Sequence, residues 1–139
     1  MKTLFIFDFD DTLAVTHSHV RVNSPSGETK LTSKEFAKYE MNKEDELDFS
    51  EFMTVKKSAY LIQSTVDDMI HAIKSHGIDN VFIVTARSDA EPVRKFLKEK
   101  GVIAPEVIAT TGSENKAVWL TRTLFNNEYD KVIVYEDCR

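Results

Sequence analysis

The fold is decided by the stretch Leu4-Phe5-Ile6-Phe7-Asp8-Phe9-Asp10-Asp11-Thr12-Leu13, in which an apolar run ends in carboxylates. Four consecutive apolar residues predict a strand buried on both faces, as in a parallel sheet. Open α/β sheets bind ligands just beyond the carboxyl ends of their strands. Two carboxylates that lie so near each other in the chain repel unless they share a proton or a divalent cation. The stretch therefore favours a metal site with a nucleophilic carboxylate, and the alternative is a turn that caps a following helix.

The bulk composition is that of a single globular domain of 139 residues, with 42% hydrophobic and 29% charged residues. A net charge of −5 excludes a general attraction to nucleic acid or to an anionic membrane. The amino-terminal apolar run is interrupted by Asp8, so it is neither a signal peptide nor a membrane span. The single Cys138 cannot form an internal disulfide, which suits a cytoplasmic protein.

Strand-like and helical patterns alternate along most of the chain. The helical patterns cover residues 58–76, residues 88 or 89 to 100, and residues 113 or 114 to 126. The strand-like runs cover residues 3–7, 80–85, 106–110 and 131–135. This alternation predicts an α/β fold, namely a three-layer α/β/α Rossmann-like domain over residues 1–139 with a parallel sheet.

Residues 14–54 do not follow that alternation. Two β-like runs, residues 20–22 and 28–32, flank Ser24-Pro25-Ser26-Gly27 and predict a short hairpin. Residues 47–53 mix acids with aromatic residues and fit either a short helix or an irregular flap. We interpret the segment as a flap or minimal cap beside the site, because long insertions of this kind are usually functional.

Chemically useful side chains follow the other predicted strands as well. Thr85 and Arg87 end the second strand, Lys116 opens the helix after the third, and Glu136-Asp137 follow the fourth. Each has an ordinary explanation when taken alone: a capping residue, a surface lysine or a charged strand end. Together with Asp8 they place acid, hydroxyl, cation and acid at four strand ends, which predicts one composite site.

This order of residues resembles the four motifs of the haloacid dehalogenase (HAD) superfamily of phosphohydrolases, which would span almost the whole chain. The resemblance implies that Asp8 is the nucleophile, Asp10 the general acid and base, Thr85 a phosphoryl-binding hydroxyl and Lys116 a stabilising cation. It also implies a Mg²⁺ cofactor bound by Asp8, by the Asp10 carbonyl and by Asp137 or, alternatively, Glu136. The substrate-binding residues would be Thr12, Ala86 and Arg87.

An acid at the position of Asp10 goes with phosphatases of this superfamily, so we expect hydrolysis of phosphate monoesters through an aspartyl-phosphate. The short insert implies an open site, and the motifs are also similar to those of polynucleotide-end phosphatases. A nucleic-acid end or a nucleotide is therefore the preferred substrate. The alternatives are a small-metabolite phosphatase with a mobile flap and a non-catalytic phosphate-binding domain of the same fold.

The chain ends at Arg139, two residues after Asp137. A full domain of the superfamily continues past the fourth motif with a helix and usually another strand, which are absent here. We therefore expect an exposed sheet edge that could support self-association.

Overall fold

A central parallel β-sheet organises the chain in the computed structural model, which describes residues 2–136 apart from the side chains of residues 37, 113 and 114. Across those residues the sheet has four strands in the order β8-β7-β1-β9, and all neighbours are parallel. The strands are β1 (Thr3–Phe7), β7 (Val81–Thr85), β8 (Glu106–Ala109) and β9 (Lys131–Tyr135). The predicted strands are confirmed, with bounds that differ by at most one residue.

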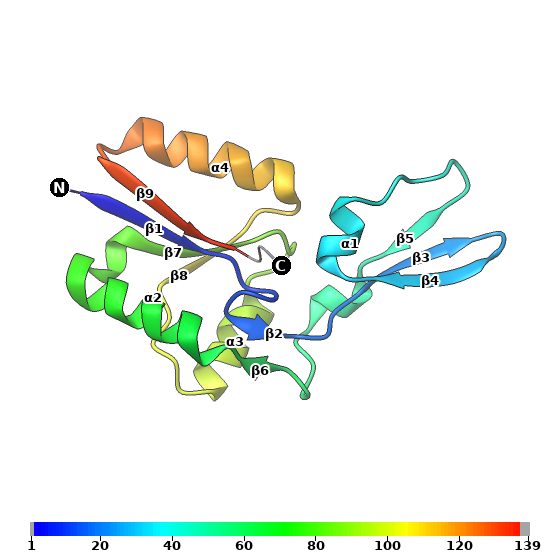
Figure 1. Cartoon of the computed structure of the whole chain (residues 1–139), viewed down its shortest axis with the longest axis horizontal. Coiled ribbons are helices and arrows are strands. Elements are labelled where there is room, and N and C mark those ends of the chain that lie inside the picture. Colours follow the sequence, from blue (N-terminus) through cyan, green and yellow to red (C-terminus); the bar gives the residue numbers. More distant parts are fainter. Residues whose placement is uncertain (1, 137–139) are drawn as a thin grey trace.

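Helices flank both faces of the sheet (Figure 1). One face packs against α2 (Gln63–His76) and α3 (Glu91–Glu99), and the other packs against α4 (Ser113–Asn126). β1 is buried along its whole length because Phe5 and Phe7 face the first layer while Leu4 and Ile6 face the second. The chain is thus a mixed α/β protein with a helix-flanked parallel sheet, which is compatible with a Rossmann-like fold.

The helix predicted from residue 58 begins later than expected, at Gln63. Tyr60–Leu61 instead forms the short strand β6, which pairs antiparallel with β2 (Ala14–Val15). The Ile62 amide then donates to the Leu13 carbonyl at 2.8 Å. The apolar spacing at the start of the predicted helix was misleading because Ala59 is buried in the core without being helical. The pairing of β2 with β6 thus brings together the two places where the insert leaves and rejoins the core.

The helix predicted from residue 88 or 89 also begins later, at Glu91. Asp89 accepts a hydrogen bond from the Glu91 amide at 3.0 Å, so it lies in the turn that precedes the helix. Between α2 and β7 the chain makes one further short 3-10 turn, η2 (Ile78–Asn80).

The insert forms a small antiparallel sheet of its own, in the order β4-β3-β5. Its strands are β3 (Val20–Ser24), β4 (Gly27–Leu31) and β5 (Glu46–Asp48). The predicted hairpin is confirmed, since Ser24 pairs with Gly27 across its turn. The third strand was not predicted, and the residues after it form the 3-10 helix η1 (Ser50–Met53), in partial agreement with the expected short helix.

A short helix, α1 (Ser33–Ala37), joins the insert's strands and was also not predicted. Thr32 and Glu35 form a capping box at its start, so the sequence signal for this helix is the Thr-x-x-Glu spacing. Figure 1 shows the insert beside the end of the central sheet toward which β1 and β9 run, with α1 on the side nearest the sheet. In the part of the chain that the structure describes, no helix combines the length and apolar character required to cross a membrane.

Candidate active site

The ends of neighbouring strands open onto a cleft of about 720 Å³. Asp8 directly follows β1, Thr85 is the last residue of β7, and Glu136 directly follows β9. Lys116 reaches the same cleft from the first turn of α4, the helix that follows β8. The structure thus brings together residues from four segments that are far apart in the sequence.

A tight turn after β1 directs two carboxylates into this cleft. The Asp8 amide donates to the Tyr135 carbonyl at 2.9 Å, which extends the β1–β9 pairing by one step. Phe9 is fully buried between the two acids, and its carbonyl accepts hydrogen bonds from the Leu13 and Ala14 amides. The buried phenylalanine anchors the turn, and Asp8 and Asp10 on either side of it both line the cleft.

Asp8 faces the ammonium group of Lys116, with 3.5 Å between Oδ1 and Nζ. Burial raises the pKa of the Asp8 carboxyl above its ordinary value, and the positive charge of Lys116 opposes that rise. The carboxylate is nevertheless accessible, with 26% of its side chain exposed to the cleft. It is a partly desolvated anion beside one cation, which is the environment of an activated nucleophile.

The loop after β8 is what places Lys116. Its backbone is tied to the loop after β7 by two hydrogen bonds, from the Thr111 amide to the Arg87 carbonyl at 3.2 Å and from the Gly112 amide to the Ala86 carbonyl at 2.9 Å. Gly112 has a φ of 117°, a conformation that L side chains rarely adopt, and α4 begins directly after it. The start of α4 is therefore held against the ends of β7 and β8.

Asp10 is held in a fixed orientation by Arg87. The guanidinium donates from Nε to Oδ2 at 2.9 Å and from a terminal nitrogen to Oδ1 at 2.7 Å, which is a bidentate pair. The Thr16 hydroxyl also donates to Oδ1 at 2.6 Å. Only 11% of the Asp10 side chain remains exposed, so its position is determined by these partners.

Arg87 lines the cleft, as the other predicted substrate-binding residue Ala86 does, but its guanidinium does not present an open fork to it. Its remaining N–H groups donate to the carbonyls of Phe52 and Thr54, both at 2.9 Å, and to the Ser18 hydroxyl at 3.3 Å. With the two bonds to Asp10, all five guanidinium donors are engaged. The sequence could not reveal this, because Arg87 and its partners lie up to 77 positions apart.

The other predicted phosphate-binding groups are placed differently from one another. Thr85 is buried, lines the cleft, and accepts a hydrogen bond from the Arg87 amide at 3.2 Å. Ala86 also lines the cleft and is exposed there. Thr12 is not among the cleft-lining residues, and its buried hydroxyl has no hydrogen-bond partner within the described part of the chain.

The insert supplies an aromatic and basic wall that sequence reasoning did not assign to the site. Phe36 and Phe49 meet edge to face, with ring centroids 5.6 Å apart, and Phe49 is 46% exposed. Phe52 and Lys34 line the same cleft. The sequence contained only a weak signal for this wall, the placing of Phe49 and Phe52 among acids in a segment with no clear period.

Three described groups could hold a Mg²⁺ ion: the carboxylates of Asp8 and Glu136 and the carbonyl of Asp10. Asp8 and Glu136 both line the cleft, and the Asp10 carbonyl belongs to the same turn as Asp8. Mg²⁺ is bound through one or two carboxylates while keeping water and substrate phosphate, so a dense cluster is not required. Within residues 2–136 no group of three or more His, Cys, Asp or Glu side chains is close enough to hold a metal. The other predicted ligand, Asp137, lies outside the described residues.

No protein-family model, curated protein or solved structure matches the chain. The chemistry of the cleft therefore rests on the arrangement of the chain's own residues.

Proposed function

We propose that this chain is a Mg²⁺-dependent phosphatase of the HAD class that hydrolyses phosphate monoesters through an aspartyl-phosphate. One observation carries the proposal: the partly desolvated Asp8 carboxylate lies 3.5 Å from Lys116, in the same cleft as an Asp10 carboxylate that is held rigidly two residues away. A nucleophile, a cation and a second acid at one sheet end are the groups that phosphoryl transfer to a carboxylate requires.

In the first step, an Asp8 oxygen attacks phosphorus while the bond from phosphorus to the leaving oxygen breaks. Asp10, which enters this step protonated, donates its proton to that oxygen, so the leaving group departs as an alcohol and Asp10 is left as a carboxylate. Lys116 offsets the charge that accumulates on the phosphoryl oxygens, and Thr85 with Ala86 lines the surface against which the phosphoryl group lies. Mg²⁺ bound by Asp8, the Asp10 carbonyl and Glu136 or Asp137 would supply further positive charge against the phosphate dianion.

In the second step, Asp10 takes a proton from a water molecule, and the resulting hydroxide attacks the phosphorus of the aspartyl-phosphate. The bond from phosphorus to the Asp8 oxygen breaks, inorganic phosphate leaves, and Asp8 is again a free carboxylate. The proton taken from water restores the acid form of Asp10 for the next turnover, and the bonds from Arg87 hold the carboxylate in position beside the nucleophile between the two steps.

The experiment is phosphate release from 4-nitrophenyl phosphate and a panel of natural phosphate esters, with Mg²⁺ and with EDTA. Wild type should turn over in the presence of Mg²⁺ only, and Asp8→Asn should not turn over. Asp68→Asn, on an exposed position of α2, is the matched control and should keep wild-type activity. Absence of turnover by wild type across the panel would overturn the proposed phosphatase activity and would favour a non-catalytic phosphate-binding domain.

The preferred substrate class, a nucleic-acid end or a nucleotide, is supported by the aromatic wall of the insert. A base stacked on an exposed aromatic ring is stabilised by about 1–3 kcal/mol, and Phe49 offers such a ring in the same cleft as Asp8. Lys34 in the same wall is suited to a neighbouring backbone phosphate. A sugar phosphate without a base would not use this wall.

The panel therefore includes 3′- and 5′-phosphorylated oligonucleotides, nucleoside monophosphates, sugar phosphates and phosphopeptides. Higher kcat/KM for the base-bearing esters than for ribose 5-phosphate would support the nucleotide class. Equal values would favour the small-metabolite alternative.

A further inference from the structure

We propose that Arg87 is a positioning residue that ties the Asp10 carboxylate to both segments joining the insert to the core, so that Asp10 is aligned only while the insert is seated. We define the outgoing linker as residues 16–19 and the returning linker as residues 52–56. The inference rests on the proposed function, because it assigns a device for controlling the acid and base of that reaction.

The guanidinium of Arg87 divides its five hydrogen bonds between these parts. Two go to Asp10, one goes to the Ser18 hydroxyl on the outgoing linker, and two go to the Phe52 and Thr54 carbonyls on the returning linker. Only 1% of the Arg87 side chain is exposed, so these bonds are made away from competing water. Losing any one partner leaves a buried charged donor unsatisfied, which makes the unit cooperative.

Asp10 also touches the outgoing linker directly, through the Thr16 hydroxyl at 2.6 Å. Thr16 and Ser18 are both buried. The carboxylate therefore has partners on the linker itself and on the arginine that holds both linkers. A shift of either linker must change the hydrogen bonds that orient Asp10.

A second network joins the two linkers to each other. Lys56 on the returning linker donates to the His17 carbonyl at 2.9 Å and to the Glu51 carboxylate at 2.8 Å. Glu51 in turn accepts from the His19 amide at 3.1 Å and from Arg21 at 3.0 Å. The linkers are thus fastened at two levels, by Arg87 next to Asp10 and by Lys56 with Glu51 further along the insert.

The returning linker begins in the cleft itself. Phe52 lines the cleft, and its ring lies 5.1 Å from the Arg87 guanidinium carbon. Its carbonyl is one of the Arg87 acceptors. A substrate that contacts the insert wall therefore acts on a residue that is two bonds away from Asp10 in the hydrogen-bond network.

The test depends on the leaving group of the substrate, because a poor leaving group must be protonated as it departs. 4-Nitrophenolate leaves without one, whereas an alkoxide requires the general acid, which contributes on the order of 10²–10⁴-fold. Arg87→Lys retains the charge but cannot form a bidentate pair and hold three further acceptors. We expect kcat/KM for an alkyl phosphate to fall about 100-fold and kcat/KM for 4-nitrophenyl phosphate to fall less than about tenfold, because kcat/KM reports on formation of the aspartyl-phosphate and not on its hydrolysis, which is common to both substrates. Equal losses of kcat/KM on both substrates would overturn the proposal, because a merely structural defect lowers both alike.

Lys56→Met tests the contact between the two linkers, since the hydrogen bonds of Lys56 go to His17 and Glu51 and not to Asp10 or Arg87. We expect the same selective loss on the alkyl phosphate, several-fold in size, and a non-additive effect when the change is combined with Arg87→Lys. Lys57→Met at an exposed neighbouring position should leave the ratio of the two activities unchanged. If Lys56→Met also leaves that ratio unchanged, the insert is not coupled to Asp10.

Hydrogen exchange gives a readout that does not depend on turnover. Arg87→Lys should speed exchange of the amides of residues 50–57, while those of β1 should be unaffected. Unchanged exchange of residues 50–57 would overturn the linker tie. Absence of wild-type turnover would overturn the proposed function alone, because the exchange result still reports on the linkers.

Discussion

The carboxyl end of the central sheet and the wall of the insert face each other across the cleft, but they are built in different ways. Asp8 directly follows β1 and Thr85 ends β7, and both strands are almost wholly buried, so the backbones of these residues are fixed by two packed layers. Four of the five residues of β4 in the insert are exposed, and hydrogen bonds from Arg87 to the Phe52 and Thr54 carbonyls tie the end of the insert to the core. The comparison indicates that the reacting groups are held on a rigid sheet, whereas the residues that would contact the rest of the substrate lie on an insert that can adjust its position.

The largest effect should come from the sheet side of the cleft. Lys116→Met removes the cation that lies 3.5 Å from Asp8, and we expect kcat/KM for any phosphate ester to fall about 10²–10³-fold. The measurement is steady-state phosphate release at saturating Mg²⁺. Lys95→Met, on an exposed face of α3, is the control. A loss that is confined to nucleotide substrates would mean that Lys116 serves substrate recognition. It would contradict the assignment of catalysis to the sheet and of recognition to the insert.

The next effect concerns the stability of the insert. Burial opposes ionisation of Glu51, but hydrogen bonds from Lys56 and Arg21 outweigh it and lower the pKa of Glu51 to about 2 from an ordinary value of 4.5. Glu51→Gln should destabilise the protein by about 2 kcal/mol at pH 7, measured by urea unfolding. Glu46→Gln, at an exposed position of β5, should have little effect.

The pH dependence of that loss follows from the direction of the shift. Because the folded-state pKa is lowered, the ionised Glu51 stabilises the fold fully above about pH 4.5, and this contribution is lost as the pH falls toward 2. The difference in unfolding free energy between wild type and Glu51→Gln should therefore shrink between pH 5 and pH 3. A difference that stays constant over this range would show that the charge of Glu51 is not what holds the linkers.

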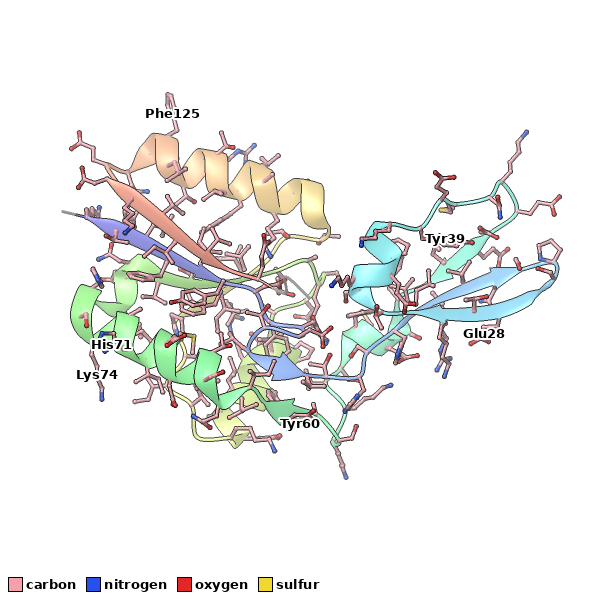
Figure 2. The ribbon with its side chains drawn as sticks, viewed as in Figure 1. Glu28, Tyr39, Tyr60, His71, Lys74 and Phe125 are labelled. Atoms are coloured by element: carbon pink, nitrogen blue, oxygen red, sulfur yellow. The ribbon has the colours of Figure 1, made fainter. Side chains whose placement is uncertain are left out.

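A smaller effect is expected at the insert wall. Phe49→Ala should raise KM for a nucleotide about tenfold, since stacking of a base contributes about 1–3 kcal/mol, and should leave kcat nearly unchanged. Phe125→Ala is a suitable control because this residue is 90% exposed and its ring projects outward from α4, away from the insert (Figure 2). A similar rise of KM for ribose 5-phosphate would contradict recognition of the base.

The smallest effect should be at Thr12. Its buried hydroxyl has no partner within the described residues, so Thr12→Val should change stability by less than about 1 kcal/mol and leave KM unchanged. Thermal unfolding and steady-state kinetics check both parts. A raised KM would restore the substrate-binding role that the sequence predicts for Thr12.

Two features separate what could be predicted from what could not. The strands of the central sheet were predictable because continuous apolar runs such as Leu4 to Phe7 can only be accommodated between two layers. The insert was predicted less well because its elements are short: the hairpin has a turn signal, whereas β5 has three residues and β6 has two. The apolar Ala59 and Ile62 then mimicked the start of a helix.

By itself the sequence determined the α/β class, the parallel sheet and the appearance of Asp8, Thr85 and Lys116 at strand ends or just beyond them, because periodicity and strand-end position are local properties. Only the tertiary structure decided what those residues touch. The engagement of all five Arg87 donors, with Asp10, Ser18, Phe52 and Thr54, joins segments up to 77 positions apart. Hydrogen-bond partners depend on where the backbone packs in space, and spacing along the chain carries no record of that.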